Sequence, residues 1–137
     1  MAFAWNVAEA LRHREADSEA MLWRPVRGML VTRVIGHANA GLLRFYTTQA
    51  EREMHAGPLR VFHDWSGLTG YDPVARDELK RWGKQHNRDF LGVHYLVRSK
   101  VVAMLISVAA LSMGRDLDAT TDRAAFLRQL DATLGAG

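Results

Sequence analysis

A histidine followed directly by an aspartate, at positions 63 and 64, is the pair whose residue types come closest to catalytic chemistry. A carboxylate can orient an imidazole so that its free nitrogen acts as a general base. The pair lies in LRVFHDWS, residues 59–66, a short apolar stretch that predicts a β-strand. Because adjacent strand residues point to opposite faces, the two side chains are expected to diverge. We therefore favour a structural role, in which Asp64 and Ser66 bond backbone groups at the strand end.

The remaining histidines do not form a metal-binding pattern. No two of them lie four residues apart, which is the helical spacing that brings two imidazoles to one metal ion, and the chain has no cysteine. The sequence also lacks a glycine-rich phosphate loop and the Gly-x-Ser-x-Gly turn of a hydrolase. We expect no catalytic residue, no metal and no cofactor. The histidines considered are His13, His37, His55, His63, His86 and His94.

Basic residues recur every four positions in the segment after this strand, and Arg81 extends the pattern. In a helix this spacing makes a stripe that drifts across about 120° of the surface. Such a stripe suits an acidic protein, a phosphorylated protein or an anionic lipid, and the alternative is a solvated face paired with Asp77. Nucleic-acid binding is not expected, because neither interleaved aromatic residues nor a recognition-helix motif is present. The basic stripe consists of Arg76, Lys80, Lys84 and Arg88.

Strand-like and helix-like segments alternate along the chain. Asn39 is placed to cap one helix, Gly57 and Pro58 to end it, and Asp72 and Pro73 to start the next. In chain order, the predicted elements are strands at 21–28 and 29–36, a helix at 39–56, a strand at 59–66, a helix at 72–91, a strand at 93–99, a helix at 101–113, a short strand at 116–121 and a helix at 122–135.

This order predicts an α/β fold with a mixed, mostly parallel sheet of four to five strands and about four helices. The two strands at 21–36 form a hairpin that ends at Gly36 and adds the antiparallel part, and Pro25 favours an edge position for the first of them. At 137 residues the chain is expected to hold one domain over residues 21–137. The packing of residues 1–20 stays open.

The most apolar segment is VVAMLISVAALSM, residues 101–113. As a helix it would be about 20 Å long, shorter than the roughly 30 Å core of a bilayer, so a transmembrane segment is not expected. We consider three roles for this segment: a helix buried on its own sheet, a dimer interface, or the wall of a pocket for an apolar ligand such as an acyl chain. The N-terminus lacks the pattern of a secretory signal, and we expect a cytoplasmic protein. The predicted pocket or interface residues are Trp82, Phe90, Met104, Ser107 and Leu111.

The chain resembles the STAS domain family of sulfate transporters and anti-sigma-factor antagonists, and more closely its SpoIIAA-like branch of stand-alone bacterial proteins. The resemblance covers roughly residues 21 to 135. It depends on the element order and on two segments: VFHDWSGLTGYDPVARDELKRW, with a strand, an Asp-x-Ser turn and a helix start, and DATTDRAAFLRQL, with a closing strand and helix. It implies a regulatory, non-catalytic domain that binds a protein partner, and it raises the expectation of a homodimer.

Regulatory members of this family carry a Ser or Thr, phosphorylated by a partner kinase, at the start of the helix after this strand. A phosphate there adds about −1.5 to −2 charges beside a helix N-terminus and changes which partner can dock. Here Pro73 and Val74 stand at that position, and neither can be phosphorylated; Thr69 is a substitute only if it lies close enough to the helix. The resemblance thus implies the family's architecture without its usual switch. The predicted interaction loop is Ser66, Thr69, Tyr71, Asp72, Pro73 and Val74.

The leading functional hypothesis is therefore a protein-binding regulatory domain that uses this loop and the basic stripe. The alternative is a small carrier or sensor of an apolar, lipid-like ligand.

Overall fold

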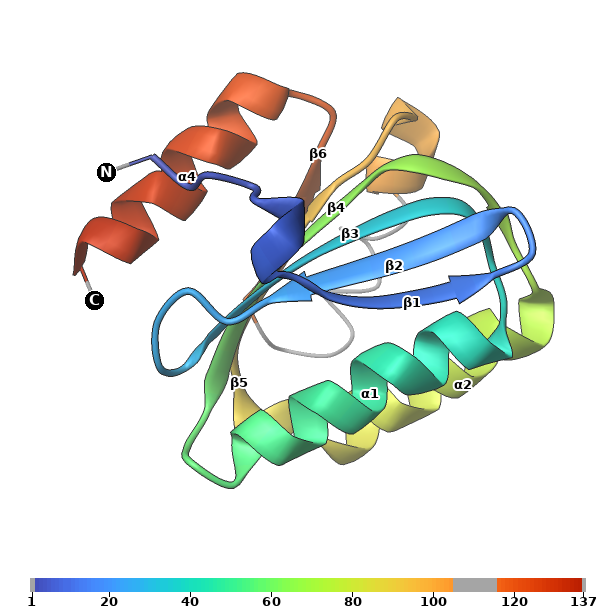
Figure 1. Cartoon of the computed structure of the whole chain (residues 1–137), viewed down its shortest axis with the longest axis horizontal. Helices are drawn as coiled ribbons and strands as arrows, with labels where there is room; N and C mark the ends of the chain where they lie inside the picture. The colour runs from blue at the N-terminus through green and yellow to red at the C-terminus, as the bar shows by residue number, and fades with distance from the viewer. Residues whose placement is uncertain (1, 105–115, 137) are drawn as a thin grey trace.

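A computed structural model gives the architecture of the protein and describes residues 2–104 and 116–136. Six strands form one sheet with the order β1-β2-β3-β4-β5-β6, and helices lie on both faces (Figure 1). The strands are β1 (Leu11–Glu15), β2 (Ser18–Trp23), β3 (Met29–Ala38), β4 (Leu59–Tyr71), β5 (Phe90–Leu96) and β6 (Leu117–Thr120). The helices are α1 (Ala40–Met54), α2 (Pro73–Gln85) and α4 (Arg123–Ala136), with short 3-10 helices η1 (Val7–Glu9) and η2 (Asn87–Asp89).

The predicted mixed, mostly parallel α/β sheet is confirmed. β1, β2 and β3 pair antiparallel, whereas β3, β4, β5 and β6 pair parallel. The sheet has six strands instead of four to five, because residues 11–15 add an edge strand beside β2. The predicted edge position of β2 is therefore wrong, and Pro25 lies beyond the last residue of that strand, where its missing N–H breaks no sheet hydrogen bond.

The predicted loop over residues 67–71 is also wrong, because β4 continues through it. These residues pair in parallel with the end of β3, which does not stop at Gly36. One register shift, between Arg33 and Ile35, precedes this region, and a second, between Gly36 and His37, lies within it. These irregularities let the two strands stay paired. Gly36 has φ +93°, and a Cβ atom there would lie 2.8 Å from the carbonyl oxygen of Asp17. A glycine is needed at this point for the strand to continue.

Helix starts match the sequence signals better than helix ends. The side chain of Asn39 accepts a hydrogen bond from the N–H of Leu42 at the start of α1, as expected. The helix α2 begins at Pro73, but it ends at Gln85 and not near residue 91. A tight turn ends it, in which the Asp89 N–H donates to the His86 carbonyl and the Asp89 carboxylate lies 3.0 Å from the His86 ring.

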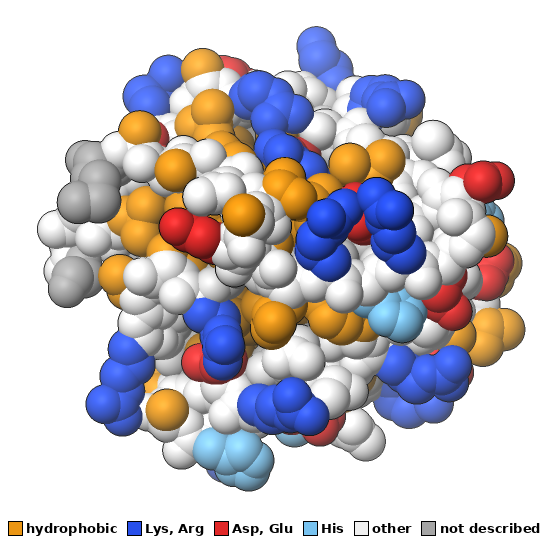
Figure 2. Space-filling view, viewed as in Figure 1, with side chains coloured by type: hydrophobic (Ala, Val, Ile, Leu, Met, Phe, Trp, Pro, Cys, Tyr) orange, Lys and Arg blue, Asp and Glu red, His pale blue; other side chains and the backbone are white. Residues whose placement is uncertain are grey.

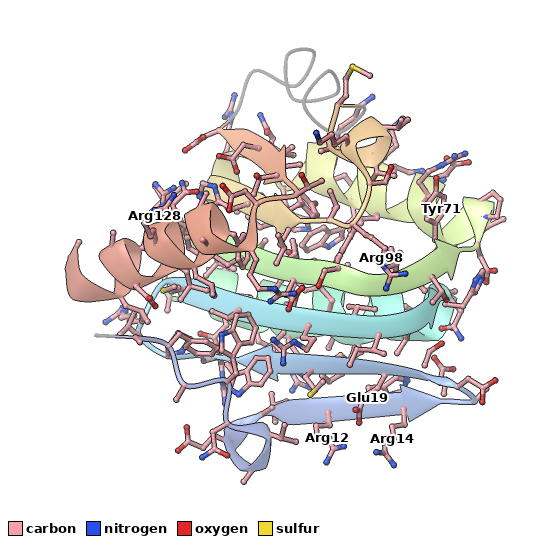
Figure 3. All side chains as sticks on the ribbon, turned by 90° about the horizontal axis from the view of Figure 1, so that it is seen from above. Arg12, Arg14, Glu19, Tyr71, Arg98 and Arg128 are labelled. Carbon is pink, nitrogen blue, oxygen red and sulfur yellow. The ribbon has the colours of Figure 1, made fainter. Side chains whose placement is uncertain are left out.

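The two faces of the sheet are covered unequally. α1 and α2 lie along one face, and α4 with the N-terminal segment lies on the other (Figure 1). Seen from the α4 side, these elements cover the region toward the N-terminal ends of the parallel strands and do not reach the C-terminal ends of β3 and β4 (Figure 3). Among the described residues, the helical turn at 100–104 follows β5 at this end of the sheet. Phe3, Trp5 and Trp23 hold the N-terminal segment in place through edge-to-face contacts of 4.8 to 5.6 Å.

The segment after β5 is described only at its start. Residues 101–104 are helical, which agrees with the predicted start of a helix, and Val101 and Met104 are each 60% exposed. The other two predicted positions on it, Ser107 and Leu111, lie outside the described residues. Within residues 2–104 and 116–136, no helix has the length and apolar character needed to cross a membrane.

Candidate functional site: an arginine-lined half of the sheet

The carboxylate of Asp64 is the most buried charge on the uncovered half of the sheet, with 3% of its side chain exposed. Ser66 donates two hydrogen bonds to its Oδ1, one from the backbone N–H at 3.1 Å and one from the hydroxyl at 2.6 Å. Burial opposes ionisation of Asp64, but these hydrogen bonds and the charge of Arg33 outweigh it and lower its pKa. Asp64 is therefore a fixed anion on which cations can be arranged.

Three arginines from three different elements converge on this anion and on Ser66. Nε of Arg33 in β3 donates to Asp64 Oδ2 at 3.0 Å. Arg123, the first residue of α4, places Nη1 3.5 Å from the same oxygen and Nη2 2.7 Å from the Ser66 hydroxyl. Arg98, just after β5, donates from Nε to the Ser66 carbonyl at 3.1 Å, and its side chain extends over β4 (Figure 3). The group carries three positive charges and one negative charge.

A second, smaller group of the same kind lies toward the sheet edge. The carboxylate of Glu19 in β2 accepts hydrogen bonds from Arg12 at 2.7 Å and from Arg14 at 2.8 Å, both in β1 (Figure 3). Burial opposes ionisation of Glu19 as well, but the two arginines outweigh it and lower its pKa. Arg12 and Arg14 lie on one face of the sheet because they are two residues apart in one strand. That face is the α4 side, since Arg12 pairs with Met21, which packs in one cluster with Phe126 of α4.

We call these five arginines, with Glu19 and Asp64, the arginine face. Five guanidinium groups and two carboxylates leave three positive charges uncompensated. Ile35 lies between the two groups on β3 and is 44% exposed, and its pairing partner on β4 is Gly67, which has no side chain to cover it. Basic side chains are also plentiful on the surface seen in Figure 2. The arginines of the face are Arg12, Arg14, Arg33, Arg98 and Arg123.

The opposite face of the sheet contains a closed histidine site. His63 is fully buried, and its Nδ1 lies 2.6 Å from the hydroxyl of Thr32. Tyr46, Trp65 and Tyr95 surround its ring at centroid distances of 4.8 to 4.9 Å. Burial lowers the pKa of His63 to about 3, so this imidazole is neutral at physiological pH. His63 and Asp64 point to opposite faces, as the strand periodicity predicted, and do not form a catalytic pair.

The second buried histidine, His94 in β5, is also occupied on both ring nitrogens. Arg60 can only donate a hydrogen bond, so its Nη1, 2.9 Å from His94 Nε2, fixes Nε2 as an acceptor. Nδ1 therefore carries the proton and donates to Asp118 at 2.8 Å. A Cβ atom on Gly92 would lie 2.6 Å from Arg60 Nη1, so glycine makes room for this arginine.

The predicted basic stripe is present on α2 but is shorter than expected. Arg76, Lys80 and Lys84 are exposed on the helix, whereas Arg88 lies in η2 beyond its end. Nε of Arg76 lies 3.3 Å from Asp77, and its guanidinium lies 5.7 Å from the ring centre of Tyr71. A shallow depression of about 260 Å³ runs along this helix, lined by Asp77, Lys80, Arg81 and Lys84.

The predicted interaction loop is divided between three structural contexts. Ser66 belongs to the arginine face, while Thr69 and Tyr71 lie in the paired extension of β4. Asp72 precedes α2 but makes no capping hydrogen bond with its side chain. Its carboxylate instead lies 2.6 Å from Nε2 of His37, because the paired ends of β3 and β4 bring that ring close. Pro73 and Val74 start α2 and are exposed.

The predicted apolar pocket is not formed by the described residues. Trp82 packs on Phe90 with ring centres 5.6 Å apart and joins the core, and Met104 is exposed. A second shallow depression, of about 390 Å³, is lined by His13, Glu15, Gly41, Arg44, Phe45, Thr48 and Gln49, most of which are polar residue types. In the part of the chain that the structure describes, no group of three or more metal-ligating side chains is found.

Comparison with known structures supports the architecture. The chain is similar to an uncharacterized protein of the DUF3478 family with a SpoIIAA-like fold, from Shewanella loihica PV-4. The TM-score is 0.64 at 16% identity, and the match covers 88% of this chain and 91% of that one. The chain therefore has the SpoIIAA-like fold that its sequence predicted. No protein-family model matches the sequence, and no curated protein matches it. At this identity the likeness concerns the fold, and function must be argued from the site.

Sequence reasoning missed most of the arginine face. Its residues come from β1, β2, β3, β4, α4 and the segment after β5, and they are up to 111 positions apart in a chain of 137 residues. One signal was available: the alternation Arg12-x-Arg14, which puts two guanidinium groups on one face of a strand.

Proposed function

We propose that this protein is a non-catalytic, regulatory binding domain that docks an acidic segment of a partner protein on the arginine face. The observation that carries the proposal is that Arg33 and Arg123 meet one buried carboxylate, while Arg98 and Arg123 bond the adjacent Ser66, on the half of the sheet that α4 leaves uncovered. Glu19 and Asp64 hold the guanidinium groups in place but neutralise only part of their charge. A partner carboxylate thus meets preorganised donors, which reduces the entropy lost on binding.

The buried histidines support the non-catalytic part of the proposal. A general base needs a ring nitrogen that can reach a substrate. Nε2 of His94 accepts from Arg60, and His63 is enclosed by aromatic rings and α1. The cytoplasmic location expected from the sequence, and the homodimer that the family resemblance suggests, belong to the same proposal. Native mass spectrometry would test the dimer directly, and a monomer at micromolar concentration would refute that part of the proposal. No described cavity favours the lipid-carrier alternative.

The basic stripe on α2 is the competing surface for an acidic partner. It is a solvated face of flexible side chains, and Arg76 is already paired with Asp77. Lysine side chains lose more rotamer freedom per hydrogen bond formed than guanidinium groups do. For this reason we assign binding to the arginine face.

A fluorescein-labelled peptide of about twelve glutamates is a suitable probe, followed by fluorescence anisotropy at an ionic strength of about 20 mM. The test variant is Arg14→Gln with Arg98→Gln and Arg123→Gln, three arginines of the face that are largely exposed. We expect its affinity for the probe to fall about tenfold or more, because each substitution removes a guanidinium group that would pair with a glutamate of the probe.

The matched control removes the same number of charges from α2, with Lys80→Gln, Arg81→Gln and Lys84→Gln. Its affinity should change less than about twofold, since only the long-range attraction weakens. An equal loss of affinity in the two variants would mean that net charge alone drives binding and that the arginine face is not a specific site. A larger loss in the α2 variant would assign binding to the basic stripe and end the proposal.

A further inference from the structure

We propose that the corner formed by Ser66, Arg98 and Arg123 is a site for a phosphate monoester, presented as a phosphorylated side chain by the acidic partner segment. This inference rests on the proposed function and names one subsite of the arginine face. Its distinguishing feature is that two guanidinium groups reach the same residue from different elements. One bonds the Ser66 carbonyl, and the other bonds its hydroxyl.

The charge at this corner matches a dianion better than a carboxylate. Arg33, Arg98 and Arg123 around Asp64 leave two positive charges uncompensated. A phosphate monoester carries about −1.5 to −2 charges near pH 7, whereas a carboxylate carries one. Arg33 and Asp64 are largely occupied with each other. The two exposed arginines are therefore the ones that would meet an incoming phosphate.

The donors at the corner are arranged for several oxygen atoms. Among the described residues, Arg98 uses only Nε for a hydrogen bond, so the N–H groups of its two terminal nitrogens are available to bind oxygen atoms. The side chain of Arg123, which carries the second guanidinium group, is 51% exposed. The planar fork of guanidinium fits two oxygens of a phosphate at once, and three oxygens can be shared between two forks.

The position of Arg123 gives an independent reason for an anion here. It is the first residue of α4, a 14-residue helix, so its positive charge lies at the positive end of the helix dipole. Asp122, just before it, offsets part of this charge and accepts from the Ala125 N–H at 3.1 Å. Arg98 bonds the carbonyl of the same Ser66, and the local excess of positive charge favours a bound anion over an empty corner.

The experiment compares two labelled acidic peptides that differ only in one central serine, which is phosphorylated in the second. For the unchanged protein, phosphorylation should raise the affinity about tenfold or more, because charge-assisted bidentate bonds are among the strongest polar contacts. In Arg98→Gln with Arg123→Gln, the gain from phosphorylation should fall to about twofold or less. Inorganic phosphate should reduce the affinity of the phosphopeptide toward that of the unphosphorylated peptide.

The matched control is Arg12→Gln with Arg14→Gln, which removes the same charge from the other group of the face. It should weaken both peptides and keep the gain from phosphorylation. If the unphosphorylated peptide binds and phosphorylation adds nothing, the phosphate site is refuted while the proposed function stands. If neither peptide binds, both ideas fail. A gain that survives loss of Arg98 and Arg123 would also refute the assignment.

Discussion

The two faces of the sheet carry polar groups under opposite conditions. On the α1 and α2 side, His63 and Thr32 are enclosed, hydrogen-bonded to each other and electrically neutral. On the α4 side, Asp64 is nearly as buried, yet it is ionised and surrounded by guanidinium groups that reach the surface. One face has used its polar residues to complete a core, and the other exposes charged side chains at the surface.

This difference shows why burial alone does not identify a binding site. A neutral, fully paired group inside a low-dielectric core has little capacity left to interact. A buried anion surrounded by an excess of cations leaves a net positive charge at the surface, and this charge attracts anionic groups from outside the molecule. The docking surface that we propose therefore lies where compensation of charge is incomplete, and not where the most unusual pKa is found.

Asp64→Asn should produce the larger effect on stability. The amide keeps the shape and can still accept from Ser66, but Arg33 and Arg123 lose their shared counter-charge. Removing one partner of a buried ion pair lowers the free energy of unfolding by about 3 kcal/mol. Urea unfolding would measure this loss as a lower midpoint. Asp77→Asn, on the exposed α2 pair, is the matched control and should leave the midpoint unchanged. Equal midpoints for both variants would show that Asp64 does not organise its arginines.

The smaller effect is a pH dependence that comes from the closed face. The pKa of His63 is about 3 in the folded protein and ordinary, about 6.5, in the unfolded chain. The unfolded chain thus binds more protons between these values, so stability is complete above pH 6.5 and falls as the pH decreases. The free energy of unfolding should drop by about 2 kcal/mol between pH 7 and pH 5.

Urea unfolding at the two pH values measures this drop, and His63→Gln should flatten it. His37→Asn is the control, because that imidazole is about half exposed. Asp64 and Glu19, whose pKa values are lowered, contribute stability that is lost only at still lower pH, below about 4. A slope that persists in His63→Gln would mean that the closed face is not the source.

Local signals predicted the parts of this structure that local physics controls. The cap at Asn39, the proline start of α2 and the closing strand β6 were all readable from residue types. The extension of β4 was not, because GLTGY contains the glycines typical of a loop and is held in the sheet by pairing with β3. Tertiary pairing overrode the local preference.

The site was harder to predict for the same reason. Arg33, Arg98 and Arg123 are each an ordinary surface arginine when taken alone. Only the parallel register, which sets Arg33 opposite Asp64, and the crossing of α4 to that face bring them together. The basic stripe was easier to find because all its members lie within 13 consecutive residues.

The most direct test of the central claim is an NMR titration that observes the arginine Nε–H signals while the glutamate peptide is added. We predict that the signals of Arg33, Arg98 and Arg123 shift together with a single binding curve. The signals of Arg76 and Arg81 on α2 should stay within the small change expected from ionic strength. Shifts confined to α2, with an unchanged arginine face, would contradict the account.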